Sequence, residues 1–596
     1  MMRRLLQVWT VGAMVLAGSL LAGVASAQNV TVTAANPPSG AQDTVSLVVK
    51  ITGKNFAPGA RSDFFKSGTT DPGGVTVRST QFVSSTEVDA TVDIAATAAI
   101  ASFDIRVSNT NGRSGKGGDL FNVVQRANNP ASACTVVPLD TTHFQLVRTL
   151  NGTISGQPQY RTALGVGLAA RRATLTYSAG SRDVIVLAAG TGPQTPGKIE
   201  IFFIDPATGA LLDNTSFVSG GPVQQHISVG VSGISSTFGP QQLAIGDVNN
   251  DGIPDIVASQ WNGIGANVAL AVGHAAPSGV LSYSLVAIPP PVAGSFGLSV
   301  ALGDLDADGF DEIAVSSGFG GSGKKMQFPK VFIYSAAGGV PSLVQTVAPS
   351  STQISTNLAY GNHVRIGDVN GDGRGDLVVG VPKWVEGGVT EAGAVFIHLS
   401  TGSRPTMVQV TPIVLTSSTP QQDDDFGAHV AIGELTGDPA GQNDLLALDY
   451  LSSPERTADV FDGPIVSTGQ SLIPSLRLAP QEGMSRGWAT TGAAIADLTG
   501  DGLGDVVVGA PNAPDSGSCD SVGAVYVFIA QGTTATGTTG WTRYMLQPPT
   551  VDVNFGAFGW STVTVPGTSL IFIGEHGRDI GGIAAGQVYV YKVLAP

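Results

Sequence analysis

The chain has 596 residues, and its 79 glycines and 35 prolines make up about 19% of them, whereas charged residues make up only 13%. So few charges together with so much glycine argue against long solvated helices and coiled coils. The 42% of hydrophobic residues supplies enough apolar material for a core, which excludes a disordered chain. The formal net charge of −15 disfavours nucleic acid as a partner and favours cations.

The first residues are typical of a cleaved export signal. Arg3 and Arg4 form a basic start, a mostly apolar stretch follows over residues 5–21, and a small-residue cleavage motif ends at Ala27. We therefore expect residues 1–27 to be a signal peptide, with a retained signal anchor as the alternative. No later segment reaches the ~18 apolar residues of a membrane-spanning helix. The mature chain, whose net charge becomes −17 when the two arginines leave, is expected to be secreted, periplasmic or on the cell surface.

Residues 29–125 alternate apolar and polar side chains in short runs that are separated by turn residues. This pattern predicts a small antiparallel β-sandwich. The stretch from Pro37 through Phe56 to Phe121 resembles an immunoglobulin-like domain of the IPT/TIG type. The resemblance implies a spacer or a binding module, which a linker over residues 126–139 joins to the rest of the chain.

From about residue 140 the sequence repeats itself. A Phe-Gly pair or a related pair recurs at intervals of 58 to 74 residues, and the seven copies lie at Leu164, Phe238, Phe296, Tyr360, Phe426, Gly487 and Phe558. Each pair is followed by short apolar runs separated by turns. Four short strands with tight turns are typical of a propeller blade, whose sheet must stack on its neighbours. We therefore predict an all-β chain in which a seven-bladed β-propeller over residues 140–596 follows the immunoglobulin-like sandwich.

The ends of the repeat region predict a closed ring. The seventh repeat stops after three strands, the last of them at residues 588–593, and residues 140–150 look like the fourth strand of the other repeats. Pairing these two segments would leave no open sheet edge. The aromatic residue of each pair is expected to pack between neighbouring blades.

The loop between the first two strands of repeats two, three, four and six carries one acidic pattern. Oxygen-bearing side chains stand at positions 1, 3, 5 and 9, glycine stands at position 6, and the carbonyl of position 7 adds a further oxygen. Oxygen ligands without histidine or thiolate favour Ca²⁺ over zinc or copper, and the number of carboxylates disfavours Mg²⁺. The predicted ligands are Asp247, Asn249, Asp251, Ile253 and Asp255 in loop two; Asp304, Asp306, Asp308, Phe310 and Glu312 in loop three; Asp368, Asn370, Asp372, Arg374 and Asp376 in loop four; and Asp497, Thr499, Asp501, Leu503 and Asp505 in loop six.

Charge supports the same interpretation. Thirteen of these ligand positions are carboxylates, and packing three or four anions together without a cation is unfavourable or raises their pKa values. About four Ca²⁺ ions would bring the mature charge to about −9. Ordinary Asp-Gly hairpin turns would not share one spacing four times. Repeat five, with Glu434 and a longer spacing to Asp444, is expected to bind weakly or not at all, and repeats one and seven lack the pattern.

The Phe-Gly pairs, the acidic loops and the Gly-Val-Pro and Gly-Ala-Pro ends of the second strands in repeats four and six resemble the FG-GAP repeats of integrin alpha-chain propellers and their bacterial relatives. The similarity covers roughly residues 140–596 and is specific in repeats two, three, four and six. It implies that the loops are Ca²⁺ sites on one face and that ligands engage the opposite face.

Other features are weaker signals of function. The tripeptide at Arg374 to Asp376 spells an adhesion motif, but Asp376 is already a predicted metal ligand. Glu575 and His576, in an expected loop on the presumed ligand face, are the best acid/base pair. Whether the two cysteines, Cys134 and Cys519, form a bridge is left open.

We therefore predict an exported, monomeric, calcium-binding propeller that binds extracellular protein or polysaccharide ligands and has no catalytic residues. The alternatives are a secreted polysaccharide lyase or glycosidase and a structural component of the cell envelope. The expected contact surface consists of the loops between the second and third strands, because their lengths and charges vary. These loops cover residues 318–326, 383–393, 451–459, 512–523 and 575–586.

Overall fold

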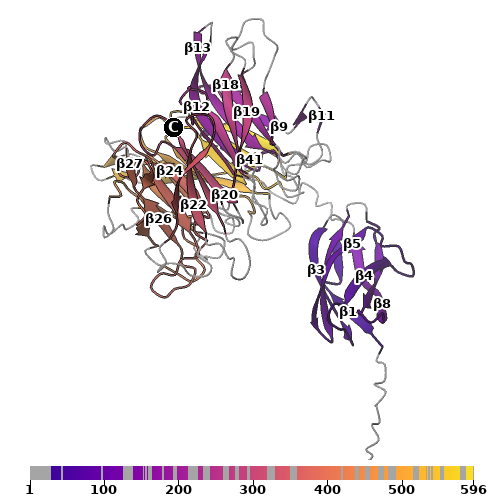
Figure 1. Cartoon of the computed structure of the whole chain (residues 1–596). Coiled ribbons are helices and arrows are strands. Elements are labelled where there is room, and N and C mark those ends of the chain that lie inside the picture. Colours follow the sequence, from indigo (N-terminus) through magenta and orange to yellow (C-terminus); the bar gives the residue numbers. More distant parts are fainter. Residues whose placement is uncertain are drawn as a thin grey trace, which may run out of the picture. The chain divides into compact units, whose positions relative to one another are not determined.

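A computed structural model of the chain divides it into two compact units, Met1–Pro130 and Ala131–Pro596 (Figure 1). The described residues contain strands and turns but no helix. The predicted signal peptide, nearly all of the linker and both cysteines lie outside them. The structure describes residues 29–41, 44–95, 98–124, 139–151, 153–154, 157–158, 164–177, 180–191, 197–212, 226–231, 242–259, 268–275, 281–291, 296–318, 329–349, 359–417, 420–435, 442–449, 457–466, 476–480, 492–513, 522–531, 533–534, 537–538, 541–550, 556–577 and 586–594.

The N-terminal unit is built from two four-stranded sheets. One sheet has the order β1 (Thr31–Asn36), β3 (Thr44–Lys54), β6 (Glu87–Ile94) and β5 (Val75–Ser84). The other has the order β2 (Ser39–Ala41), β8 (Ser114–Val124), β7 (Ala101–Ser108) and β4 (Arg61–Lys66), and its β2 and β8 are parallel. Side chains of β6 alternate between buried and half-buried, so one face of its sheet covers the core. The immunoglobulin-like type of this unit stays a prediction.

The C-terminal unit contains seven four-stranded antiparallel sheets among its described residues, which we call blades one to seven in chain order. Each blade contributes its strands in sequence order, and blade seven takes its fourth strand from the beginning of the unit. Blades one to three consist of β12 (Leu168–Tyr177), β13 (Gly180–Gly190), β14 (Gly197–Ile204) and β15 (His226–Val231) in blade one; β16 (Gln242–Gly246), β17 (Asp255–Ser259), β18 (Val268–Ala275) and β19 (Leu281–Ile288) in blade two; and β20 (Phe296–Gly303), β21 (Glu312–Ser317), β22 (Lys330–Ser335) and β23 (Ser342–Val347) in blade three. Blades four and five consist of β24 (Val364–Gly367), β25 (Asp376–Val381), β26 (Ala394–His398) and β29 (Ile413–Leu415) in blade four; and β30 (His429–Gly433), β31 (Asp444–Leu448), β32 (Ala458–Phe461) and β33 (Leu476–Leu478) in blade five. Blades six and seven consist of β34 (Ala493–Ala496), β35 (Asp505–Ala510), β36 (Ala524–Ala530) and β39 (Trp541–Leu546) in blade six; and β40 (Ser561–Thr564), β41 (Leu570–Glu575), β42 (Gln587–Val593) and β9 (Phe144–Asn151) in blade seven.

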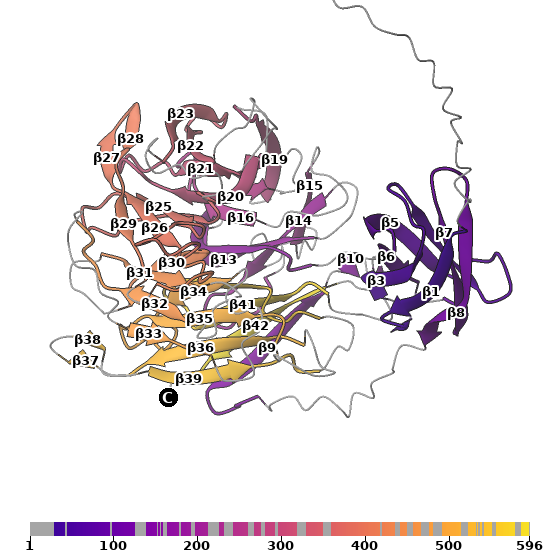
Figure 2. The ribbon, with the colours of Figure 1, turned by 90° about the horizontal axis from the view of Figure 1, so that it is seen from below.

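The first strands of the blades contact one another in a ring. β12 contacts β16, each later first strand contacts the next, and β40 of blade seven contacts β12 of blade one. The two views of the unit show the sheets following one another in the order of the colour scale (Figures 1 and 2). This is the arrangement of a β-propeller, and the predicted all-β propeller fold is confirmed.

Hydrophobic cores lie between adjacent blades, as expected for sheets that are buried on both faces. Seven clusters of buried side chains each combine residues of two neighbouring blades, including one cluster shared by blades seven and one. Phe296, Tyr360, Phe426 and Phe558 are completely buried in four of these clusters. The aromatic residue of the repeated pair therefore packs between blades, as predicted. Phe238 and Gly487 lie outside the described residues.

The glycine of the pair makes a turn that other residues rarely adopt. Gly427 and Gly559 have φ values of 79° and 86°. A Cβ atom on Gly427 would lie 2.4 Å from the Ala394 carbonyl oxygen of the preceding blade. The pair is thus fixed by backbone conformation and by close approach to the neighbouring blade.

β9 pairs with β42 in an antiparallel register from Phe144 opposite Val593 to Asn151 opposite Gln587 (Figure 2). Leu164 of blade one also forms a parallel bridge with Gly586 of blade seven. The ring is therefore closed by strands from opposite ends of this unit. The finer domain boundaries that the sequence predicts, including a sandwich over 29–125 and a closing strand over 140–150, stay predictions.

Short hairpins interrupt the repeated pattern in a way that the sequence did not predict. β27 (Ser400–Ser403) and β28 (Thr406–Val408) lie between the third and fourth strands of blade four, and β37 (Thr533–Thr534) and β38 (Gly537–Thr538) hold the same place in blade six. A further hairpin joins β10 (Thr153–Ile154) and β11 (Gln157–Pro158). Among the described residues, no helix has the length and apolar character required to cross a membrane.

Closure predicts that two truncations will have unequal effects. Removing residues 139–151 exposes the edge of β42 and its buried face, so the melting temperature of the propeller should fall by several degrees or the protein should fail to fold. Removing residues 29–125 should leave the propeller transition unchanged, because that unit has its own core. Differential scanning calorimetry of both truncated proteins measures this, and equal effects would contradict the closure.

Candidate metal sites

The four acidic loops occupy equivalent places in their blades. Each loop joins the first strand to the second: β16 to β17, β20 to β21, β24 to β25 and β34 to β35. Position 1 directly follows the first strand, and position 9 is the first residue of the second strand. Because the blades share one strand order, all four loops lie at the same end of the ring.

The carboxylate at position 1 organises the coil of each loop. In loop two, Asp247 accepts hydrogen bonds from the backbone N–H groups of Asp251 (3.1 Å) and Gly252 (2.8 Å). Asp304, Asp368 and Asp497 make the same two bonds in the other loops. The glycines at position 6 have φ values between 78° and 88°, which supports the role predicted for them.

Position 4 also has positive φ, a feature that the sequence analysis missed. Asn250 and Ala307 have φ values of 55° and 60° there, and loops four and six use Gly371 and Gly500. Alanine is uncommon in this region of backbone space. Asparagine or glycine at position 4 of three loops was the available signal.

Position 9 is a carboxylate with no exposed surface in all four loops: Asp255, Glu312, Asp376 and Asp505. One of its oxygens accepts the backbone N–H of position 2, as in the 2.9 Å bond from Val248 to Asp255. In loops two, four and six the other oxygen accepts an N–H group near or just beyond the end of the third strand. Burial raises the pKa to about 7 for Asp255 and Asp505, about 6 for Asp376 and about 8 for Glu312.

Blade five has the buried carboxylate at position 9 without the predicted ligand spacing, so it separates the structural role of this carboxylate from its predicted role as a metal ligand. Asp444 is fully buried, burial raises its pKa to about 6, and its oxygens accept the N–H groups of Leu435 and Gly463 at 2.8 Å each. The rest of this loop, residues 436–441, lies outside the described residues. The buried carboxylate therefore ties the hairpin to the third strand even in a repeat whose sequence lacks the ligand spacing.

Loop three gathers its carboxylates most closely. Oxygen atoms of Asp304, Asp306 and Glu312 lie within 4.8 Å of one another. Burial and the neighbouring charge of Asp308 raise the pKa of Asp306. The buried Oδ1 of Asp306 has no hydrogen-bond partner among the residues that the structure describes. An unpaired buried oxygen beside other carboxylates fits the oxygen-ligand set that Ca²⁺ requires.

A cationic side chain from the next blade already contacts loop three. Arg404, in the turn between β27 and β28, donates from Nη2 to Glu312 (2.9 Å) and Asp308 (3.2 Å) and from Nε to Asp306 (3.2 Å). The guanidinium thus satisfies part of the negative charge of the loop. This contact could not be predicted from the sequence, because the arginine lies about a hundred residues away in an insertion.

The remaining predicted ligands are only partly tested by these contacts. The side-chain oxygens of Asn249 and Asn370 accept the N–H of position 5, at 3.2 and 2.9 Å, so they point into their loops. The Thr499 hydroxyl lies 3.5 Å from an oxygen of Asp497. The complete ligand sets, including the carbonyls at position 7, stay predictions (residues Ile253, Phe310, Arg374 and Leu503).

Backbone hydrogen bonds connect loops three and four and the equivalent hairpin of blade five to the loop of the preceding blade. The N–H groups of Asp311 and Gly375, both at position 8, donate to the carbonyls of Asp247 and Asp304, which stand at position 1 of the preceding loops. Asn443 of blade five donates to the carbonyl of Asp368 in the same way, at 2.8 Å. The order of a loop is therefore coupled to the contact between blades.

The two weaker signals for other functions do not form accessible sites. Asp376 of the adhesion-like tripeptide has no exposed surface. Glu575 ends strand β41, is buried and accepts a hydrogen bond from Tyr589, so its expected place in a loop was wrong. Burial lowers the pKa of His576 to about 4, and its ring centre lies 4.4 Å from that of Trp560.

Comparison with known proteins agrees with the repeat pattern. The FG-GAP repeat family matches residues 296–327, 360–398 and 489–528. These three segments of the chain are FG-GAP repeats. These matched segments include the first two strands and the acidic loops of blades three, four and six, so the predicted resemblance is confirmed.

Integrin alpha chains are similar to this FG-GAP protein over part of its length. Mouse (Mus musculus) integrin alpha-IIb is 31% identical over 156 residues, which are 25% of this chain and 15% of that protein. Human (Homo sapiens) integrin alpha-7 is 31% identical over 210 residues, 30% of this chain and 17% of that protein. The matched region thus spans less than a fifth of these relatives. A solved DUF4784 family protein from Bacteroides caccae is 14% identical with a TM-score of 0.22, covering 73% of this chain and 93% of its own, a similarity too low to indicate a shared fold.

The raised pKa values of position 9 predict how the FG-GAP propeller responds to pH without divalent ions. A carboxyl group with a pKa near 7 in the folded state and about 4 in the unfolded state binds more protons when folded over that range. The free energy of unfolding of the ion-free protein should therefore decrease as the pH rises. Bound Ca²⁺ should remove this trend, because it holds the carboxylates ionised.

The measurement is the melting temperature of the dialysed, ion-free protein from about pH 6.5 to 8. Below this range His363, His398 and His576, whose pKa values are lowered by burial, act in the opposite direction. Asp255→Asn should make the decrease shallower, since it removes one titrating group. A melting temperature that rises with pH over this interval would contradict the prediction.

Proposed function

We propose that this FG-GAP protein is an exported, calcium-binding β-propeller that acts as a non-catalytic binding or adhesion protein for extracellular protein or glycan ligands. Its similarity to integrin alpha chains supports the binding or adhesion class. The observation that carries the calcium proposal is the shared construction of the four loops, each with a position-1 carboxylate that organises the coil and a buried carboxylate at position 9.

Calcium is the cation that these loops suit best. Their side-chain donors are carboxylate, amide and hydroxyl oxygens, which are ligands of hard cations. The buried carboxylates have raised pKa values, so they are destabilised as anions until a positive charge is near. We propose about four ions, one in each of loops two, three, four and six. In loop three the incoming ion would replace the contacts that Arg404 makes.

We propose that ligands bind the opposite face, where the second and third strands are connected. Among these connections, residues 383–393 lie entirely within the described part of the chain. Lys383 anchors this loop through Glu391 and Asp425, at 2.5 and 2.9 Å. The Trp384 ring packs edge-on against Phe396, with ring centres 5.2 Å apart. The loop thus presents a supported tip, on which Val385 is 42% exposed.

The enzymatic alternative would need titratable groups that converge in an accessible cleft. The acid/base pair suggested for such an enzyme is Glu575 and His576. Glu575 is buried and accepts a hydrogen bond from Tyr589, which suits a structural role better than a catalytic one. A structural envelope role differs from adhesion only in the partner, so the ligand experiment below also addresses it.

Removal of calcium should destabilise the propeller. An ion bound only by the folded state at 100 times its dissociation constant adds about 2.7 kcal/mol to the free energy of unfolding. We expect native mass spectrometry to find about four Ca²⁺ ions, and the melting temperature to fall by several degrees in excess chelator. Asp251→Ala and Asp308→Ala should each lose one ion.

The matched control is Asp71→Ala, which removes one exposed carboxylate from the N-terminal unit. It should retain the full number of ions. Absence of calcium after incubation with the ion, or a melting temperature that chelator leaves unchanged, would disprove the calcium proposal.

A labelled sample of the calcium-loaded protein should bind specific members of a glycan or protein array. Val385→Asp places a charge on the tip of the 383–393 loop. It should weaken binding of the ligands that the array identifies by about tenfold or more, because this charge would lose its water when a ligand covers the loop. Surface plasmon resonance measures the affinity.

Val340→Asp provides the matched control for this experiment. Val340 is 68% exposed in the turn between β22 and β23, at the loop end of the ring that carries the acidic loops. It should leave binding unchanged. Equal losses in both variants would show that the ligands do not use the proposed face.

A further inference from the structure

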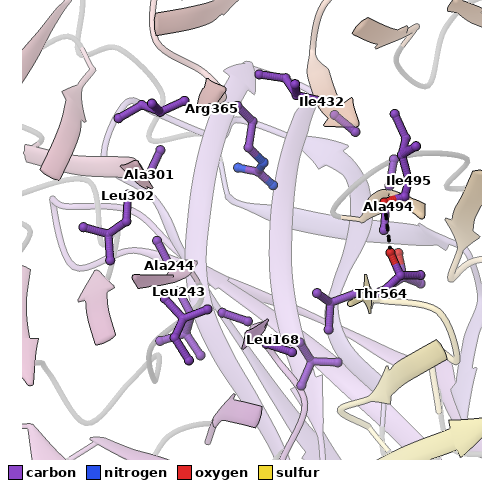
Figure 3. Close-up of a pocket in the computed structure, with 18 of the residues that line it drawn as sticks. Leu168, Leu243, Ala244, Ala301, Leu302, Arg365, Ile432, Ala494, Ile495 and Thr564 are labelled. Atoms are coloured by element: carbon purple, nitrogen blue, oxygen red, sulfur yellow. Dashed lines mark hydrogen bonds between the residues drawn. The ribbon is translucent and has the colours of Figure 1, made fainter. Parts of the chain in front are cut away.

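The ring of first strands encloses a cavity of about 280 Å³ on the axis of the propeller. Its walls are formed mainly by alanine, leucine, isoleucine and valine side chains from all seven blades (Figure 3). Arg365 of β24 is the one charged residue among those that line it, and its guanidinium points into the cavity (Figure 3). Thr562 and Thr564 also line it, so the cavity combines aliphatic side chains with polar groups and one charge, and its volume is just below the usual range of small-molecule sites.

The arginine breaks the repeat at its position. Arg365 stands three residues before position 1 of loop four. At the same distance before the loops of the other repeats stand Ala244, Ala301, Ala431 and Ala494. These small side chains leave the space that the guanidinium enters. The fold of a blade therefore does not require an arginine here, since four other blades are built with alanine.

The guanidinium has no counter-charge in the described part of the chain. Among the described residues, its one hydrogen bond runs from Nη1 to the carbonyl of Val364, at 2.9 Å. Other arginines of the propeller, such as Arg172 and Arg404, pair with carboxylates. Burial lowers the pKa of Arg365 only to about 10, so the group remains charged at neutral pH. A cation that is partly withdrawn from water without a partner is unfavourable, and an anion would relieve this cost.

We propose that this cavity binds a small molecule with a carboxylate group and an aliphatic tail, and that Arg365 binds the carboxylate. The planar guanidinium presents paired N–H donors that match the two oxygens of a carboxylate. Leu243, Leu302 and Ile432 on the walls offer apolar contact for the tail. The site is separate from the acidic loops and does not depend on the proposed calcium role.

Hexanoate is the probe, and titration calorimetry of the calcium-loaded full chain in chloride-free buffer is the measurement. We expect one hexanoate to bind per chain, and 1-hexanol, which lacks the charge, to bind at least about tenfold more weakly. Arg365→Ala should lose binding by about tenfold or more while folding normally, because alanine occupies this position in four other blades. Unchanged melting of the variant verifies that it is folded.

Arg172→Ala is the matched control, since it also removes one arginine of the propeller but lies in an exposed pair with Asp183. It should bind hexanoate like the unaltered protein. Three results would overturn the proposal: equal binding of hexanoate and hexanol, full binding by Arg365→Ala, or sulfate and chloride binding as tightly as hexanoate.

Discussion

Five of the seven blades are organised around a buried carboxylate at the start of the second strand. In blades two to six this residue has no exposed surface and accepts the N–H group that begins the hairpin loop. In four of these blades its second oxygen also accepts an N–H group near or beyond the end of the third strand. A single side chain thus joins three successive strands, and hydrogen bonds to a charged acceptor are stronger than those between neutral groups. The cost is an anion held away from water.

Different blades offset that cost in different ways. Loops two, four and six surround the buried carboxylate with further aspartates, which makes the anion less stable until a divalent cation is present. Loop three receives a guanidinium from Arg404 of the following blade. Blade five keeps the buried carboxylate Asp444 although its sequence lacks the ligand spacing. The structural role of this residue is therefore more general than the metal site, and we interpret the acidic loops as metal sites built around an existing structural carboxylate.

Local spacing explains how much could be predicted from the sequence. The repeat length, the four-strand order and the acidic loops depend on residues close together in the chain, so the propeller and the coil of the loops followed from them. Arg404 could not be predicted, because its contact depends on which hairpin of the next blade reaches loop three. Arg365 was overlooked because its place in the cavity is evident only once the first strands of the seven blades are arranged around the axis. Glu575 was misplaced because a strand end and a glycine-rich loop are difficult to distinguish without the register of β41.

The backbone bonds between successive loops mean that a metal ion bound in one acidic loop would affect the next blade as well. The position-8 N–H groups of Asp311 and Gly375 donate to position-1 carbonyls of the preceding loops. The same position-1 residues carry the carboxylates that accept the N–H groups of their own loops. An ion that fixes position 1 would therefore fix the acceptor for the next blade as well. Such bonds join the blades at the end that carries the acidic loops, and the bridges of Gly393 with Phe426 and of Gly523 with Phe558 join neighbouring blades at the opposite end. The loops between the second and third strands, whose sequences vary in length and charge, therefore stand on blades that are joined to their neighbours at both ends.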